Sequence, residues 1–317
     1  MSEKEIRTVA VIGAGIMGIG IAQSFAEAGL SVRMIARNQQ RLEQSLASVE
    51  ANLRLFAEFN LLRETPSVIT SRIKIIPSEE LAEATKGCDF VLETVPEVLE
   101  TKRAIFAQLD RLPAEVILAS NTSSFTMDVL SEKMQSPQRM LGLHYFNPAH
   151  IIPAVEIHKG KHTTDGVVKQ TRALMIRSGK KPVLVQKTVP GFIINRLTGS
   201  MEREIDYLID EGIVTPEDLD TAVKASIGFR LACMGPMAQE DMIGLDTSAR
   251  VSGNVFKVLS NKTEPSPVLL EKVGKGELGI KAGKGWYDYS GKTRDEVNDS
   301  INRRLLRQLA LFRSVEK

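Results

Sequence analysis

A glycine-rich turn near the N-terminus constrains the fold more than any other feature of this chain. The run Gly13-Ala14-Gly15-Ile16-Met17-Gly18 directly follows an apolar, β-branched segment and opens an amphipathic helix. In such a turn the first glycine allows the tight bend, the second lets a pyrophosphate approach the backbone, and the third permits close helix packing. The helix N-terminus then offers N–H donors to phosphates. The turn therefore predicts a dinucleotide site, the alternative being a merely tight strand-to-helix connection.

The pattern beyond the turn predicts two domains. Short β-branched runs alternate with helical stretches as far as Pro190-Gly191, where the alternation stops and helical sequence follows. We expect an α/β fold, with a Rossmann-like dinucleotide-binding domain over residues 1–189 and a smaller all-helical domain over residues 190–317. The predicted strands are 7–12, 31–35, 73–76, 90–93, 116–120, 141–146, 154–158 and 182–186, and the predicted helices are 17–28, 40–58, 99–109, 164–178, 193–211, 215–225, 239–256 and 295–315.

Composition and charge exclude several classes of protein. The 41 basic residues nearly balance 39 acidic ones, and no basic block is present, so we expect no nucleic-acid partner. Cys88 and Cys233 form neither a C-x-x-C motif nor a paired framework, which favours a reducing, cytoplasmic location. The uncharged stretch 8–26 is broken by four glycines, and acidic residues precede it, so we expect neither a membrane span nor a signal peptide.

The end of the second predicted strand bears on the choice of cofactor. Ala36 occupies the position where an acidic residue would bind the ribose hydroxyls of NAD, and Arg37 follows it. A guanidinium suits the 2′-phosphate of NADP, although Arg37 could instead stack on adenine or lie in solvent. We expect NAD or NADP, with a slight preference for NADP.

Several segments together resemble the L-3-hydroxyacyl-CoA dehydrogenase family. The resemblance covers almost the whole chain, and several motifs in the same order are more specific than the glycine turn alone. Its motifs are 120–124 (SNTSS), 142–148 (GLHYFNP), 190–196 (PGFIINR), 234–236 (MGP), 243–246 (IGLD) and 283–289 (GKGWYDY).

The resemblance implies roles for particular residues. His144 and Glu156 match the family's acid–base pair, twelve residues apart. A neutral imidazole can accept the hydroxyl proton of a secondary alcohol, and a carboxylate can fix its tautomer. Ser123 and Asn195 match polar residues that hold the substrate oxygen. By the same resemblance, we expect Glu97, Lys102 and Asn121 to lie at the cofactor-binding site.

Each assignment has a structural alternative. His144 could be a core residue, Ser123 a turn or cap residue, and Asn195 a helix cap, while Glu97 and Lys102 could form an ordinary solvated salt-bridge face. We expect His150, His158 and His162 to be surface or structural residues, and we expect no metal site.

Two departures from the acyl-CoA pattern point to a different substrate. The segment 45–54 has Arg54 as its single basic residue, whereas acyl-CoA members carry lysines there for the CoA phosphates, and Glu50 would repel them. Residues 227–233 look like an insertion and resemble relatives that oxidise free 3-hydroxy acids, such as L-gulonate or carnitine dehydrogenases. Arg230 could clamp a substrate carboxylate there, or form a salt bridge between the domains.

These expectations define a function. We predict an oxidoreductase of fatty acid metabolism that transfers hydride between NAD or NADP and the 3-hydroxy group of an acyl-CoA, acting as a homodimer. The alternative is a dehydrogenase of a free 3-hydroxy acid. A non-catalytic dinucleotide-binding or crystallin-like protein is a further alternative, because a fold alone does not settle function.

Overall fold

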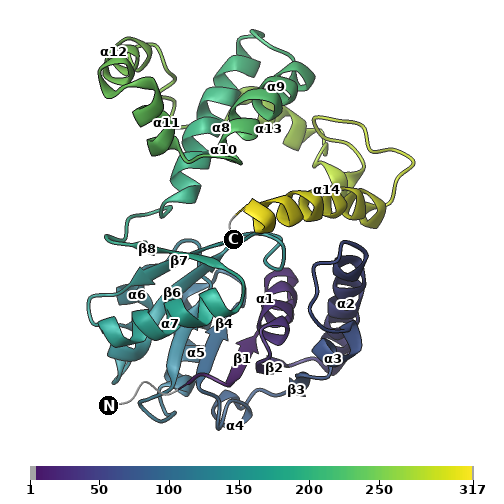
Figure 1. Ribbon diagram of the computed structural model, residues 1–317, viewed down its shortest axis with the longest axis vertical. Coiled ribbons are helices and arrows are strands. Elements are labelled where there is room, and N and C mark those ends of the chain that lie inside the picture. Colours follow the sequence, from purple (N-terminus) through teal and green to yellow (C-terminus); the bar gives the residue numbers. More distant parts are fainter. Residues whose placement is uncertain (1–4, 316–317) are drawn as a thin grey trace. The chain divides into compact units, whose positions relative to one another are not determined.

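The computed structural model describes residues 5–315 and contains one eight-stranded sheet (Figure 1). Its strand order is β3-β2-β1-β4-β5-β6-β7-β8. The first six strands are parallel, β7 runs antiparallel to β6, and β8 runs parallel to β7. The predicted α/β fold with a Rossmann-like domain is confirmed. The strands are β1 (Thr8–Ile12), β2 (Ser31–Ala36), β3 (Ile73–Pro77), β4 (Phe90–Glu93), β5 (Ile117–Ser120), β6 (Met140–Tyr145), β7 (Ala154–Lys159) and β8 (Lys181–Val185).

Helices cover both faces of this sheet, which explains why its central strands read as continuous apolar runs. On one face the core is formed with α1 (Ile16–Glu27), α2 (Gln39–Glu58), α3 (Pro66–Thr70) and α7 (Asp165–Arg177). On the other face the core is formed with α4 (Leu81–Ala84), α5 (Leu99–Leu109) and α6 (Met127–Ser131). Because the carboxyl ends of the parallel strands meet at one edge, the loops that follow β1, β2, β4 and β5 lie close together there.

The chain divides into two compact units, and the division differs from the boundary expected at residues 189 and 190. Unit 1 comprises the described residues up to Ile193 together with those from Asn302 onward, and unit 2 comprises Ile194–Ile301. The chain returns to unit 1 because most of α14 (Arg294–Val315) packs on its surface. Leu306 and Leu309 bury against Phe56 and Ile151 there.

Unit 2 is helical, as predicted, but two of its segments differ from expectation. The single helix expected over 239–256 is two helices, because Gly244 adopts φ +100° between them. The supposed insertion 227–233 is largely helical and continues α9 through a π-helical turn, Lys224–Gly228. The helices are α8 (Ile194–Asp210), α9 (Pro216–Val223), α10 (Phe229–Leu231), α11 (Pro236–Ile243), α12 (Leu245–Val255) and α13 (Pro267–Gly274).

Two further features of the described residues concern membrane-spanning helices and cysteine thiols. Within residues 5–315, no helix combines the length and the apolar character needed to cross a bilayer. Both cysteines are free thiols, and burial raises the pKa of the Cys88 thiol to about 11.

Candidate active site

The structure brings His144 and Glu156 together on neighbouring strands. They are directly opposed in the antiparallel ladder between β6 and β7, so their side chains share one face of the sheet. His144 Nδ1 lies 2.8 Å from Glu156 Oε2, and both side chains are buried. This contact directs the Nδ1 proton of a neutral imidazole to the carboxylate, which leaves Nε2 as the basic ring nitrogen.

Two phenylalanines and one backbone amide surround the pair. The His144 ring has edge-on contacts with Phe146 and Phe192, with ring centroids 4.7 and 5.6 Å apart. The backbone N–H of Ile193 donates to Glu156 Oε1 at 3.1 Å. These contacts hold the carboxylate at both oxygens and limit the positions open to the imidazole.

The polar loop after β5 lies at the same sheet edge as His144. Ser120 is in register with Gly142 on the parallel strand β6. Asn121, the next residue, therefore lies beside the part of β6 that carries His144. The Asn121 side chain accepts a hydrogen bond from the backbone N–H of Tyr145 at 2.9 Å. Ser123 is half-buried, and its backbone N–H donates to Glu97 Oε1 at 3.0 Å. The Asn121 side chain therefore ties this loop to β6.

The glycine-rich turn has the steric properties of a phosphate cradle. Gly13 has φ +118°, and a Cβ there would lie 2.5 Å from Thr94 Oγ1. A Cβ on Gly18 would lie 2.0 Å from the carbonyl oxygen of Gly13, so the helix can approach the strand only without one. A Cβ on Gly15, by contrast, would meet nothing within 4 Å. The backbone at Gly15 is thus open to a ligand, and the turn fits the pyrophosphate of a dinucleotide.

A cavity of about 580 Å³ begins beside this turn. Gly13, Ala36 and Arg37 line it, together with Glu79 and apolar residues of α5. Its position at the ends of β1, β2 and β4 is that of an adenosine site in a doubly wound sheet. Arg37 therefore lies in the candidate cofactor cavity, as does the carboxylate of Glu79.

Lys102 forms a buried ion pair with Glu93, and the more exposed Glu97 joins this pair. Lys102 Nζ lies 2.8 Å from Glu93 Oε1 and 3.1 Å from Glu97 Oε2, and Lys102 and Glu93 are fully buried. Burial raises the pKa of Glu97, but the hydrogen bond from Thr122 and the charge of Lys102 outweigh burial and hold that pKa below its usual value. Glu97 is therefore an ionised anchor for the loop after β5.

Asn195 and Arg230 are in unit 2. Asn195 lies in the first turn of α8 with its side chain exposed, and its backbone carbonyl accepts from Thr198 Oγ1. Arg230 is exposed in α10.

Sequence reasoning missed two residues of this region. Glu93 ends the fully buried strand β4, and its position there, nine residues before Lys102, was the available signal. His158, which was expected to be a surface or structural residue, is buried, and its Nε2 lies 3.5 Å from Glu156 Oε2. His144, Glu156 and His158 also bring three donor atoms close together, and the expectation of no metal site stays a prediction. The cause is strand alternation, which places residues 156 and 158 on the same face.

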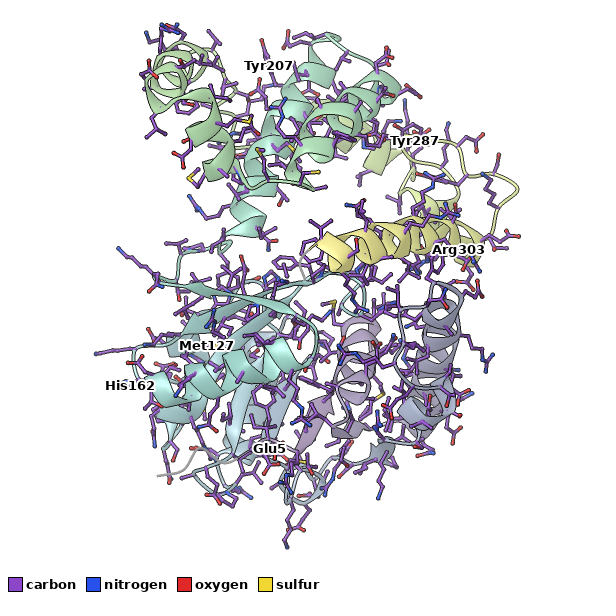
Figure 2. The ribbon with its side chains drawn as sticks, viewed as in Figure 1. Glu5, Met127, His162, Tyr207, Tyr287 and Arg303 are labelled. Atoms are coloured by element: carbon purple, nitrogen blue, oxygen red, sulfur yellow. The ribbon has the colours of Figure 1, made fainter. Side chains whose placement is uncertain are left out.

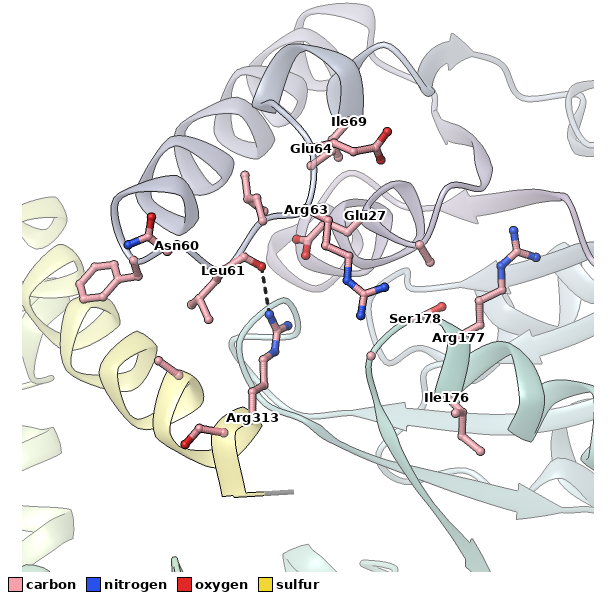
Figure 3. Close-up of a pocket in the computed structure, with 16 residues that line it drawn as sticks. Glu27, Asn60, Leu61, Arg63, Glu64, Ile69, Ile176, Arg177, Ser178 and Arg313 are labelled. Atoms are coloured by element: carbon pink, nitrogen blue, oxygen red, sulfur yellow. Dashed lines mark hydrogen bonds between the residues drawn. The ribbon is translucent and has the colours of Figure 1, made fainter. Parts of the chain in front are cut away.

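A second cavity, of about 740 Å³, lies in unit 1 between the ends of α1 and α7, residues 59–64 and α14 (Figure 3). The side chains of Arg63, Arg177 and Arg313 line it, and Arg313 donates to the carbonyl of Leu61 at 3.2 Å. It contains neither the glycine-rich turn nor the His144–Glu156 pair.

The fold and site define a class. A Rossmann-like sheet with an open glycine-rich turn and a buried His–Glu pair at its carboxyl edge is the arrangement of a nicotinamide-dependent oxidoreductase. The family model for the 3-hydroxyacyl-CoA dehydrogenase NAD binding domain matches residues 8–189, and the model for the C-terminal domain of the same enzymes matches residues 191–289. The chain belongs to the 3-hydroxyacyl-CoA dehydrogenase family.

Individual relatives differ in what they act on. A 5-formyl-3-hydroxy-2-methylpyridine 4-carboxylate 5-dehydrogenase of Mesorhizobium japonicum is 34% identical over 302 residues, covering 95% of this chain and 96% of the relative. A probable 3-hydroxybutyryl-CoA dehydrogenase of Bacillus subtilis is 36% identical over 291 residues, covering 91% and 99%.

Solved structures show the same two kinds of relative. A crystal structure of the pyridine carboxylate dehydrogenase, an NAD⁺-dependent dismutase, has a TM-score of 0.89 at 33% identity and covers 97% of this chain and 99% of its own. The (S)-3-hydroxybutyryl-CoA dehydrogenase of Ralstonia eutropha has a TM-score of 0.73 at 35% identity and covers 90% and 100%.

Proposed function

We propose that this protein oxidises or forms a secondary alcohol at the 3-position of an acyl-CoA, with hydride exchanged with a nicotinamide cofactor. The observation that carries the proposal is the buried His144–Glu156 contact of 2.8 Å at the sheet edge where the glycine-rich turn opens. Several relatives of this chain are named as 3-hydroxybutyryl-CoA or hydroxyacyl-CoA dehydrogenases. A pure dinucleotide-binding or crystallin-like protein would not need such a pair.

The cofactor and the protein side chains have different roles in this reaction. The nicotinamide, when bound, supplies the hydride acceptor or donor. In the oxidative direction His144 Nε2 accepts the hydroxyl proton, and in the reductive direction it returns that proton to the carbonyl oxygen. Glu156 keeps the Nδ1 proton in place and stabilises the imidazolium that forms. Ser123 and Asn195 position the reacting oxygen.

A free carboxylate substrate is a second candidate, and specific observations favour it. Arg54 is the sole basic residue in the segment 45–54, and it already pairs with Glu50 at 3.3 Å, so little positive charge is left there for CoA phosphates. The similarity to the pyridine carboxylate dehydrogenase, with its TM-score of 0.89, also supports a substrate without CoA. In this case Arg230 would bind the carboxylate. Candidates include free 3-hydroxy acids of the L-gulonate or carnitine type.

The cofactor cavity supports use of NADP as well as NAD. Arg37 lines the cavity, where its guanidinium would suit a 2′-phosphate, and residue 36 is alanine rather than an acidic residue. Glu79 lines the same cavity, and its charge opposes that of the phosphate. We therefore expect activity with both cofactors and only a modest preference for NADPH.

One assay separates the two substrate classes. Purified protein is given acetoacetyl-CoA with NADH and NADPH in parallel, and is tested in the oxidative direction on free 3-hydroxy acids and on pyridine carboxylates. Rapid turnover of the thioester supports the first proposal. Turnover confined to free acids overturns it in favour of the second, and Arg230→Ala should then raise the KM for the acid.

The apolar surface of unit 2 supports a homodimer. Its helices α8 to α13 contain no fully buried residue, and large apolar side chains such as Leu197, Phe229 and Phe256 are exposed. Helices with unpartnered apolar residues usually mark an interface, most often between copies related by a twofold axis. Analytical ultracentrifugation tests this, and a monomer at micromolar concentration would contradict it.

The free thiols Cys88 and Cys233 support a cytoplasmic location.

A further inference from the structure

His158 is a buried histidine whose ring nitrogens are not satisfied. Its side chain is 1% exposed, and neither Nδ1 nor Nε2 has a hydrogen-bond partner among the residues that the structure describes. A buried polar group left unsatisfied loses its hydrogen bonds to water without replacement, which destabilises the folded state. In native proteins such groups mark a bound water, an ion or a strained functional site. The unsatisfied ring nitrogens of His158 therefore indicate a bound ligand or a functional role.

The atom that His158 faces is shared with His144. Glu156 Oε2 lies 2.8 Å from His144 Nδ1 and 3.5 Å from His158 Nε2. One donor atom from each of the three residues lies within 4.8 Å of the others. Two ligands bound to Zn²⁺ at about 2.0–2.1 Å in a tetrahedral site are about 3.3 Å apart. Shifts of a few tenths of an ångström at Glu156, and a larger closing of the two rings, would complete such a site.

We propose that His144, Glu156 and His158 form a site for a transition-metal cation of the Zn²⁺ type, and that its occupancy inhibits the enzyme. Two imidazoles and one carboxylate without a thiolate suit Zn²⁺, Co²⁺, Ni²⁺ or Cu²⁺, whereas Mg²⁺ and Ca²⁺ prefer sets made entirely of oxygen. Three protein ligands leave a fourth position for water.

Inhibition follows from which ring nitrogen of His144 carries the proton. When Nδ1 coordinates the cation, its proton moves to Nε2, because a neutral imidazole carries one proton. Nε2 then has no lone pair to accept the proton of a substrate hydroxyl. The carboxylate of Glu156 is drawn to the cation as well, so it no longer orients the imidazole.

The surroundings favour retention of a bound cation. The Phe192 ring packs against His158, with ring centroids 3.8 Å apart, and also contacts the His144 ring edge-on at 5.6 Å. An apolar shell and held ligands strengthen metal binding. The Ile193 amide fixes the far oxygen of Glu156. The His144 side chain is 8% exposed, so the cluster is not sealed from solvent.

The first test is spectroscopic and needs no substrate. Chelator-treated protein is titrated with Co²⁺, and the visible d–d absorption of tetrahedral Co²⁺ is expected to saturate at stoichiometric metal and to disappear on addition of Zn²⁺. In His158→Leu the affinity should fall by at least the about 10- to 100-fold that loss of an outer-shell partner costs, since a direct ligand is lost. The matched control is His162→Leu, because His162 is exposed on the surface of unit 1 (Figure 2) and should leave the titration unchanged.

A more conservative variant and an activity assay give a second test of the site. His158→Asn retains a polar side chain, and circular dichroism establishes that each variant is folded. Zn²⁺ should inhibit the wild type and the His162 variant at the same concentration, and both His158 variants only at about 10-fold higher concentration or more. Absence of Co²⁺ absorption in the wild type, equal metal affinity in the His158 variants, or equal competition by Mg²⁺ would each overturn the site. The Co²⁺ result is independent of which substrate the enzyme uses.

Discussion

Lys102 Nζ lies 2.8 Å from Glu93 Oε1, and neither side chain has any surface exposed to solvent. The carboxylate of Glu93 also accepts from Ser120 Oγ at 2.6 Å and from the backbone N–H of Val95 at 2.7 Å. This contact joins α5 to the ends of β4 and β5, so it supports the loops on which the candidate site depends.

Replacing Lys102 with Met should destabilise the protein strongly. The substitution leaves the carboxylate of Glu93 buried without its cation, and breaking a buried pair in this way costs about 3–5 kcal/mol. Urea unfolding measures the change. The double variant Lys102→Met with Glu93→Gln removes both charges and should recover part of the loss. A single-variant cost below about 1 kcal/mol, the range of an exposed pair, would refute the network's role.

Removal of the acid–base pair should lower turnover without loss of cofactor binding. His144→Ala is expected to reduce kcat by about 100- to 10,000-fold, because it removes the proton acceptor. Glu156→Gln should reduce kcat as well, since an amide does not fix the tautomer or stabilise the imidazolium. Calorimetric titration with the cofactor should give the same Kd for each variant as for the wild type. Unchanged turnover in His144→Ala would exclude the mechanism.

The glycines of the turn should respond to alanine in different ways. Gly18→Ala places a Cβ 2.0 Å from the Gly13 carbonyl oxygen, so the turn must deform and both stability and cofactor affinity should fall. Gly15→Ala meets no atom of the protein within 4 Å, so its stability should stay within about 0.5 kcal/mol of wild type. Cofactor affinity should nevertheless drop in Gly15→Ala, because the methyl group occupies the place of the pyrophosphate. Equal cofactor affinity in Gly15→Ala and wild type would show that the phosphates bind elsewhere.

Stability should fall with pH below about 6.5 because of His150. Burial, and then the charge of Lys180, lower the pKa of His150 to about 4 from its model-peptide value of 6.5. The unfolded chain therefore binds a proton between these values that the folded chain does not, so stability is lost as pH falls through this window, by up to about 3 kcal/mol. Glu27, whose pKa burial raises, acts in the opposite direction.

The variant His150→Phe isolates this contribution, since the ring stays beside Phe56 and loses its titration. Urea unfolding between pH 4.5 and 7.5 should show a smaller pH dependence in His150→Phe than in the exposed control His162→Phe, by about 1 kcal/mol or more. Identical slopes would mean that His150 does not titrate in this range.

The parts of the fold that sequence predicts well are those decided by local pattern. The strands around Val11 and Leu92 are apolar along most of their length because helices cover both faces, so composition alone identifies them. The His144–Glu156 pair could be predicted from the twelve-residue spacing of the matching residues in the family. The antiparallel register of β6 and β7 explains that spacing. The glycine-rich turn could be predicted because a side chain at Gly13 or Gly18 would clash with the backbone or with Thr94.

The parts that sequence does not predict depend on distant partners. The alternation of β7 places His158 beside Glu156, but nothing local shows that a second imidazole approaches the same oxygen. Lys102 looks like a surface lysine until Glu93 is known to face it. The apolar residues Leu306 and Leu309 predict that α14 packs on something, yet not that it returns to Phe56 in the first unit.

That return has a consequence for how the protein can be divided. Because residues 194–301 leave unit 1 and residues 302–315 rejoin it, unit 2 is an insertion tethered at both ends. A single proteolytic cut between the units would leave them covalently joined through the other connection. A fragment ending at residue 193 would lack α14 and expose Phe56 and Ile151. The rational minimal form of unit 1 is therefore residues 1–193 joined by a short linker to residues 302–317.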